Sequence, residues 1–153
     1  MKIGFWKITD TYGAFSNWYI SEFMHEGHYF ISSEQALMWH KAKLFGDTET
    51  MAKIMQTQRQ NEIKALGREV KGYIDEQWAA LRYRIMVDIL KDKFMQNPSI
   101  ASVLLGTGDA ELYEASPYDK IWGIGSTDVS QVNGTNLLGK ALMEVREYIR
   151  REV

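Results

Sequence analysis

The segment "SSEQALMWHKAKLFGD", residues 32–47, decides the fold because it carries its own start and stop signals for a helix. Ser32 or Ser33 can cap the first turn by accepting a hydrogen bond from a free backbone N–H. Gly46 stands where many helices end in a left-handed residue. The segment therefore predicts a helix over residues 33–45.

Two charged side chains of this helix, Glu34 and Lys41, are seven residues apart, which is close to two full turns. They are therefore expected on one side of the helix, near the apolar residues Leu37, Met38 and Phe45. A poorly hydrated surround raises the pKa of a carboxyl group and lowers that of an amine, which prepares both for chemistry near neutral pH. From spacing alone, a solvated flank of an amphipathic helix is the simpler explanation.

The rest of the chain adds helices and a few short strands. Periodicity and turn signals predict helices at 48–56, 59–67, 75–97, 98–106 and 135–151, and strands at 3–8, 28–32, 111–116 and 120–123. In the long helix, Trp78, Leu81, Ile85 and Ile89 recur at helical spacing and are expected to face the core. The predicted fold class is mainly α, a small α+β arrangement in one compact domain over residues 1–153.

Composition narrows the function classes. With 153 residues, 45% of them hydrophobic, the chain can bury one real core. A net charge of −2 argues against broad nucleic-acid binding, which needs a basic surface, but is compatible with a local basic pocket. No stretch approaches the ~20 apolar residues of a membrane span, and the first residues lack a signal-peptide core. We expect a cytoplasmic protein with no membrane partner; the sequence does not indicate an oligomeric state.

Metal and thiol chemistry find little support. The chain has no cysteine, which excludes disulfides, thiolate metal sites and a cysteine nucleophile. Its three histidines, His25, His28 and His40, look too few and too scattered for a metal site. We therefore predict no metal and no cofactor.

Two segments could contact a ligand. The loop "SPYDKIWGIG", residues 116–125, contains Asp119, Trp122 and two glycines that would allow close backbone approach. An irregular connection in which Trp122 fills the core explains it equally well. At "NGTNLLGK", residues 133–140, Thr135 or Asn136 is expected to cap a helix whose free N–H groups could also hold an anion.

A basic turn and a tryptophan are further candidates. The turn "GREVKG", residues 67–72, offers Arg68 and Lys71 for a phosphate, although a plain surface turn is equally compatible. Trp78 lies on an apolar helix stripe, where core packing is the commoner role than forming a ligand wall.

The order and spacing of five blocks resemble the YbiA-like NADAR family, named for NAD and ADP-ribose. The blocks are "FSNWY", "SEQALMWHKAKLFGD", "GREVKG" with the following Trp, "KFMQNPSIASVLLGTGDAELYEASPYDKIWGIG" and "GTNLLGKALMEVR". The resemblance runs from Phe15 to Arg146. It implies a YbiA-like fold and an N-glycosidase that hydrolyses the bond between ribose C1′ and an exocyclic amino group of a base.

Two substrate classes follow from the resemblance. One is the phosphoribosylamino-pyrimidine intermediates of riboflavin synthesis, and the other is ADP-ribose attached to guanine in nucleic acid. The alternative is a module that binds ADP-ribose or a related nucleotide without turnover. The partner implied is a nucleotide-like small molecule or ADP-ribosylated guanine.

The resemblance also implies roles for individual residues. Glu34, Lys41 and Asp119 would be catalytic. The implied substrate-binding residues are Asn17, Tyr19, Arg68, Lys71, Trp78, Trp122 and Asn136. Some family members carry an acid two residues after the loop tryptophan, where this chain has Ile124. The second acid therefore stays open between Asp119, which the motif favours, and Glu114 or Asp109.

The resemblance leaves two routes for bond cleavage. An activated water can attack C1′ while Glu34 acts as general acid or stabilises the cationic sugar. Alternatively the sugar ring opens and Lys41 forms a Schiff base that water then releases. We favour water attack.

Overall fold

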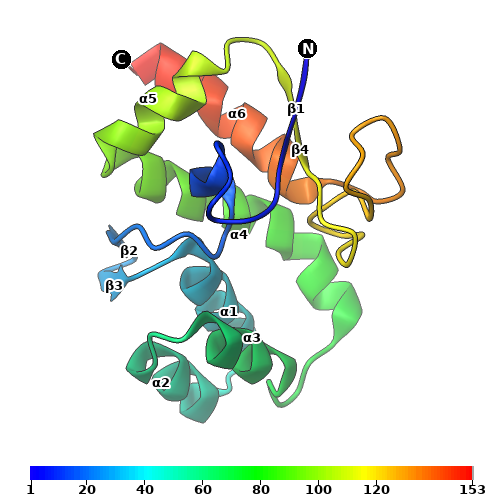
Figure 1. Cartoon of the computed structure of the whole chain (residues 1–153). Coiled ribbons are helices and arrows are strands. Elements are labelled where there is room, and N and C mark those ends of the chain that lie inside the picture. The colour runs from blue at the N-terminus through cyan, green and yellow to red at the C-terminus, as the bar shows by residue number, and fades with distance from the viewer. Residues whose placement is uncertain (153) are drawn as a thin grey trace.

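The computed structural model describes residues 1–152, in which six α-helices pack with two small two-stranded sheets (Figure 1). In chain order the elements are β1 (Lys2–Phe5), a 3₁₀ turn η1 (Gly13–Phe15), β2 (Phe23–His25), β3 (His28–Phe30), α1 (Ser33–Leu44), α2 (Thr48–Gln56), α3 (Gln60–Arg68), α4 (Asp75–Met95), α5 (Pro98–Gly106), β4 (Glu111–Glu114) and α6 (Leu137–Glu152). The mainly helical fold class predicted from the sequence is confirmed, and α2 and α5 have the predicted bounds. No helix within residues 1–152 combines the length and apolar character needed to cross a bilayer.

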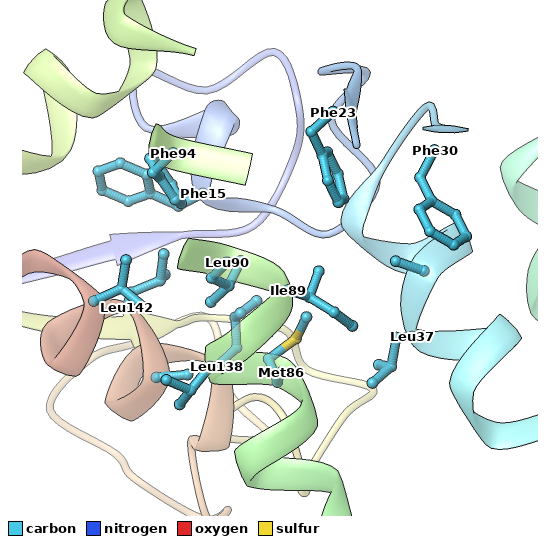
Figure 2. Packing of buried hydrophobic residues seen from close by; sticks show 14 of the residues in the cluster. Phe15, Phe23, Phe30, Leu37, Met86, Ile89, Leu90, Phe94, Leu138 and Leu142 are labelled. Carbon is cyan, nitrogen blue, oxygen red and sulfur yellow. The ribbon is translucent and has the colours of Figure 1, made fainter. Parts of the chain in front are cut away.

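Helix α4 holds the molecule together. In Figure 1 it runs through the centre, with α1, α2 and α3 on one side and α5, α6 and β4 on the other. Figure 2 shows its side chains Met86 and Ile89 between Leu37 of α1 and Leu138 of α6. All four are at most 1% exposed, and burial of a side chain this size stabilises the fold by roughly 1.5–3 kcal/mol.

Strands β1 and β4 pair in parallel although they come from distant parts of the chain. The register runs from Lys2 opposite Glu111 to Phe5 opposite Glu114. Parallel strands bring their carboxyl ends to the same edge of a sheet. Trp6, which follows β1, and Glu114, which ends β4, are therefore delivered to one side of the molecule.

The first turn of α1 is fixed by side-chain caps. The Ser32 hydroxyl accepts a hydrogen bond from the Gln35 N–H at 3.1 Å, so Ser32 is the N-cap. The Gln35 amide oxygen accepts from the Ile31 N–H at 2.9 Å, and its amide nitrogen donates to the Ile54 carbonyl at 3.0 Å. Gly46 adopts a φ of 70° after the last turn, as a helix-ending glycine should.

The hairpin of β2 and β3 was only half predicted, because its first strand is short and only its second has a clear pattern. Phe23 pairs with Phe30, and Glu26 and Gly27 make the turn with φ of 49° and 79°. The hairpin corrects the expectation of scattered histidines, because it brings His25 within 2.8 Å of His40 on α1, measured between their Nε2 atoms.

Other expectations also need correction. Residues 120–123 form bends rather than a strand, because their backbone groups bond to the start of α6 as described below. That helix begins at Leu137, two residues later than predicted. Leu81 is 45% exposed, so it lies off the buried stripe of α4.

Lys93 is an ionisable group in the core of α4, with 0% of its surface exposed. Its Nζ donates to the Ser16 carbonyl at 3.3 Å and to the Ser33 hydroxyl at 3.5 Å, both long hydrogen bonds. The Ser33 hydroxyl in turn donates to Asn17 Oδ1 at 2.8 Å. Burial lowers the pKa of Lys93 to about 7.

We predict that Lys93→Met is more stable than the wild type at pH 7, and that this advantage shrinks as pH rises towards 10. The unfolded chain keeps the lysine proton up to pH ~10.4, whereas the folded chain releases it near 7. The free energy of unfolding of the wild type therefore increases with pH across this interval, whereas that of the Met variant does not increase for this reason. Urea unfolding at several pH values measures the difference.

Lys140→Met on the exposed side of α6 is the matched control, since it removes a solvated lysine. A stability difference for Lys93→Met that stays constant between pH 7 and 10 would contradict burial of the amine.

Candidate active site

A cleft of about 660 Å³ lies where α1, α3 and the start of α4 face the end of β4 and the loop after it. Glu34 and Lys41 both line it, and Leu37 and Met38 between them line it as well. The side of α1 that spacing singled out therefore faces the cleft. Lys43, two residues after Lys41, lies on another side of α1, is exposed and pairs with Glu26 at 2.9 Å.

The cleft combines aromatic walls with charges of both signs. Its aromatic side chains are Trp6, Trp18, Tyr73, Trp78, Tyr118 and Trp122; its cations are Lys7, Lys41, Lys64, Arg68 and Arg82; its acids are Glu34, Asp75, Glu114 and Asp119. Aromatic faces stack on planar bases, and clustered Arg and Lys side chains bind phosphate. The composition suits a nucleotide-like ligand.

Glu34 is held at the bottom of this cleft by the first turn of α1. Its backbone N–H donates to the Asn17 carbonyl at 3.0 Å, and its side chain is only 9% exposed. Burial raises the pKa of Glu34 to about 7; the charge of Lys64 opposes the rise and that of Asp119 adds to it. A carboxyl group with this pKa can give or take a proton at neutral pH.

Lys41 lies two turns along the same helix, half-buried, with its Nζ 4.6 Å from the centre of the Tyr73 ring. Burial lowers the pKa of this amine; the Glu34 carboxylate opposes the shift and the Arg68 guanidinium reinforces it. A lysine with a lowered pKa is the form that can act as a nucleophile.

Asp119 shapes the loop that closes the cleft. Its Oδ1 accepts hydrogen bonds from the N–H groups of Ile121 at 2.9 Å and Trp122 at 2.8 Å. Gly123 follows in a place with no room for a side chain, because a Cβ there would lie 2.8 Å from the Asp119 carbonyl and 2.9 Å from that of Glu114. The loop is therefore tightly wound around this acid.

The start of α6 anchors the same loop, which overturns one expectation. The N–H groups of Leu137 and Leu138 donate to the carbonyls of Ile121 and Trp122, both at 3.1 Å. These N–H groups could have held an anion if they were free, but the loop occupies them.

Asn136 instead supports the acid at the end of β4. It is buried in a left-handed conformation with φ of 56°. Its Oδ1 accepts from the Glu114 N–H at 3.0 Å, and its Nδ2 donates to the Leu112 carbonyl at 2.9 Å. Asn136 does not line the cleft, so it can act on a ligand only through its neighbours.

Glu114 is the acid that the sequence could not rank. It lines the cleft, and its Oε2 is buried without a hydrogen-bond partner among residues 1–152. Burial raises the pKa of Glu114 to about 8, and the charges of Asp119 and Glu34 add to the rise. Asp109 is outside the cleft lining and pairs with Arg150 at 3.0 Å.

The remaining sequence candidates divide between cleft and surface. Asn17 and Arg68 line the cleft. Tyr19 does not; it is half-buried against the core, and its neighbour Trp18 takes the place at the cleft. Lys71 is also outside, with its side chain 80% exposed and 3.8 Å from Glu49.

The two interpretations of the tryptophans turn out to be compatible. Trp78 is 4% exposed and belongs to the core, yet it also lines the cleft. Trp122 packs on the core and lines the cleft in the same way.

Three cations of the cleft were missed: Lys7, which follows Trp6 in the chain, and Lys64 and Arg82 on helices. Lys64 stands one turn before Arg68 on α3, and Arg82 one turn after Trp78 on α4, so helical spacing from known candidates could have found both. The Nε of Arg82 is buried and has no partner among the described residues.

Fold and site together define a class: a small, mainly helical domain in which one helix presents a buried carboxyl group and an amine to an aromatic, cation-rich cleft. The chain belongs to the NADAR domain family, whose sequence model matches residues 4–150.

Two curated relatives and one solved structure match most of this chain. The N-glycosidase R617 of Acanthamoeba polyphaga mimivirus is 41% identical over 145 residues, covering 87% of this chain and 85% of its own. The N-glycosidase Npun_R5314 of Nostoc punctiforme is 34% identical, with 98% and 94% covered. The NMR structure of Escherichia coli YbiA superposes with a TM-score of 0.85 at 28% identity, covering 99% of this chain and 88% of that one.

We predict that Asp119→Ala loosens the loop and that Asp119→Asn largely preserves it. Ala leaves the N–H groups of Ile121 and Trp122 without their acceptor, a loss of about 1–3 kcal/mol of stability, whereas the Asn side chain keeps an oxygen there. Urea unfolding and the near-ultraviolet circular dichroism of the tryptophans test this. Equal behaviour of the two variants would show that the turn does not depend on the Asp119 oxygen.

Proposed function

We propose that this protein is an N-glycosidase that hydrolyses the bond between ribose C1′ and an exocyclic amino group of a nucleotide-like substrate. The observation that carries the proposal is a buried carboxyl group, Glu34, whose pKa is raised to about 7 inside an aromatic cleft. The relatives named N-glycosidase, at 34–41% identity over most of the chain, support the same reaction class.

The cleft can orient such a substrate by its two ends. Trp78 and Trp122 offer ring faces for the base or the sugar. Arg68, Lys64 and Arg82 supply positive charge for a phosphate. A volume of about 660 Å³ falls within the range of sites that enclose one small molecule.

In the route we favour, Glu34 donates its proton to the exocyclic nitrogen as the C1′–N bond breaks. The bonding electron pair leaves with the nitrogen, which departs as a neutral amine. Positive charge develops at C1′ and the ring oxygen, where the carboxylate now left on Glu34 stabilises it. Water attacks C1′ and loses a proton. That proton either passes to the Glu34 carboxylate, which restores the acid, or leaves to solvent.

Asp119 and Glu114 share the task of the second acid. Asp119 uses Oδ1 to hold the loop, which leaves Oδ2 to orient the water. Glu114 has a pKa of about 8 and is therefore mostly protonated at neutral pH. A protonated Glu114 limits the negative charge around Glu34 and can donate a hydrogen bond to a sugar hydroxyl.

The second route gives Lys41 the leading part. The sugar ring opens to an imine between C1′ and the exocyclic nitrogen, the Lys41 amine adds to C1′, and the base amine leaves. Water then hydrolyses the lysine Schiff base and returns the free amine and the ribose aldehyde. The lowered pKa of Lys41 makes this route available.

Both substrate classes contain the proposed scissile bond. A relative from Vibrio vulnificus, 32% identical, is named a riboflavin biosynthesis protein, but the matched region covers only 38% of that protein. The net charge of −2 favours a free nucleotide over an extended nucleic acid. We therefore put phosphoribosylamino-pyrimidines first and ADP-ribosylated guanine second.

Glu34→Gln should lower the rate of ribose phosphate release at least ~100-fold, because an amide cannot donate the acid proton. Chromatographic product assays with both substrate classes measure this, and Glu49→Gln on exposed α2 is the matched control. Binding of ADP-ribose by calorimetry with no turnover of either substrate by the wild type would instead identify a binding module.

The rate should fall as pH rises through about 7 if water attack with acid catalysis operates, because Glu34 must then be protonated. The lysine route predicts the opposite slope, since the amine reacts only without its proton. A pH profile of kcat/KM on the wild type distinguishes the two.

Borohydride added during turnover should leave no stable adduct if water attacks C1′ directly. Mass spectrometry of the treated protein tests this, with Lys41→Gln and the exposed Lys43→Gln as a matched pair. A reduced sugar adduct on Lys41, absent in Lys41→Gln and kept in Lys43→Gln, would replace water attack by the imine route.

A further inference from the structure

Three potential metal ligands converge on the side of α1 that the cleft does not use. His25 ends β2, Glu26 is in the hairpin turn, and His40 lies near the end of α1. His25 Nε2 and His40 Nε2 are 2.8 Å apart. Glu26 Oε2 lies 3.1 Å from His40 Nε2 and 3.5 Å from His25 Nε2. None of these three residues lines the cleft of the candidate active site.

A fourth residue fixes the orientation of the central ring. Asp92 on α4 places Oδ2 2.6 Å from His25 Nδ1. The carboxylate accepts the Nδ1 hydrogen, so neutral His25 turns an unprotonated Nε2 towards His40 and Glu26. This carboxylate–histidine arrangement is the one that orients histidine ligands in zinc sites.

The centre of the cluster has more acceptors than hydrogens. His25 Nε2 and Glu26 Oε2 are both acceptors, and at 2.8 Å and 3.1 Å only the hydrogen on His40 Nε2 lies between them. If that hydrogen moves to His40 Nδ1, three lone pairs face one point. A divalent cation there satisfies all three at once.

We propose that His25, Glu26 and His40 form a binding site for Zn²⁺, oriented by Asp92. Two imidazoles and one carboxylate are a ligand set that zinc accepts, with water in the fourth position. In tetrahedral zinc with Zn–N bonds of ~2.05 Å the two nitrogens stand ~3.3 Å apart. The ligand pair, now 2.8 Å apart, needs to open by about half an ångström, which small side-chain rotations provide.

The exposure of Glu26 and of Lys43 allows an ion to reach the site from solvent. Glu26 is 42% exposed, so an ion can enter from solvent. Lys43 pairs with the other carboxylate oxygen, Oε1, at 2.9 Å, so Oε2 faces only the two histidines. Lys43 is itself 49% exposed and can move aside.

The position of the ligands suggests what the ion does. It would tie the β2–β3 hairpin to α1, with Asp92 extending the link to α4. His40 is next to Lys41 on the chain, yet faces away from the cleft. The site would therefore stabilise the helix that carries Glu34 and Lys41 and take no part in the reaction.

The test is Zn²⁺ titration of the full chain after dialysis against a chelator, followed by calorimetry and thermal unfolding. We expect one Zn²⁺ per chain and a rise in Tm of about 5–10 °C at a hundredfold excess over Kd. Glu26→Gln and His40→Gln should remove the rise. Asp92→Asn should weaken binding by about 10–100-fold, as loss of an orienting carboxylate does.

His28→Gln is the matched control, because His28 is on the same hairpin but is exposed and packs on Trp39 with ring centres 4.9 Å apart. It should bind Zn²⁺ like the wild type. Co²⁺ in place of Zn²⁺ should give the visible absorption of a tetrahedral site in wild type and His28→Gln only. Unchanged binding in folded His40→Gln and Glu26→Gln, or no Tm shift in the wild type, would overturn the proposal.

Discussion

The burial of one carboxyl group at the first turn of α1 is the constraint on which the site depends. The backbone of Glu34 is fixed in this poorly hydrated position, because its N–H is bonded to the Asn17 carbonyl and Ser32 caps the helix just before it. A carboxyl group in such a place favours its neutral form. The same constraint keeps its proton available for a leaving group at neutral pH.

Several parts of the fold serve this position. Helix α4 packs against α1 through Met86 and Ile89, which lie next to Leu37 in Figure 2. The parallel pairing of β1 and β4 brings Glu114 to the cleft, and Asn136 holds its backbone there. The site is therefore assembled from both halves of the molecule. The charge of Asp119 adds to the rise in the pKa of Glu34 and of Glu114, and the charge of Glu34 adds to that of Glu114.

Much of the fold was predictable from sequence because the helices carry local signals. Ser32 and Gly46 mark the ends of α1, and Pro98 starts α5 where a proline is tolerated. The family and the placement of Glu34 and Lys41 on one face also followed. The parallel β1–β4 pair, the role of Asn136 and the meeting of His25 with His40 did not, because each joins segments that only the tertiary structure brings together.

The most direct test of the central claim is the titration of the glutamate carboxyl carbons by NMR in ¹³C-labelled wild type, with Glu34→Gln and Glu114→Gln for assignment. Two glutamates should have a pKa far above the usual range, Glu34 about 7 and Glu114 about 8. A Glu34 signal that titrates near its ordinary value of 4.5 would mean that the carboxyl group is solvated and that the proposed acid catalysis has no physical basis.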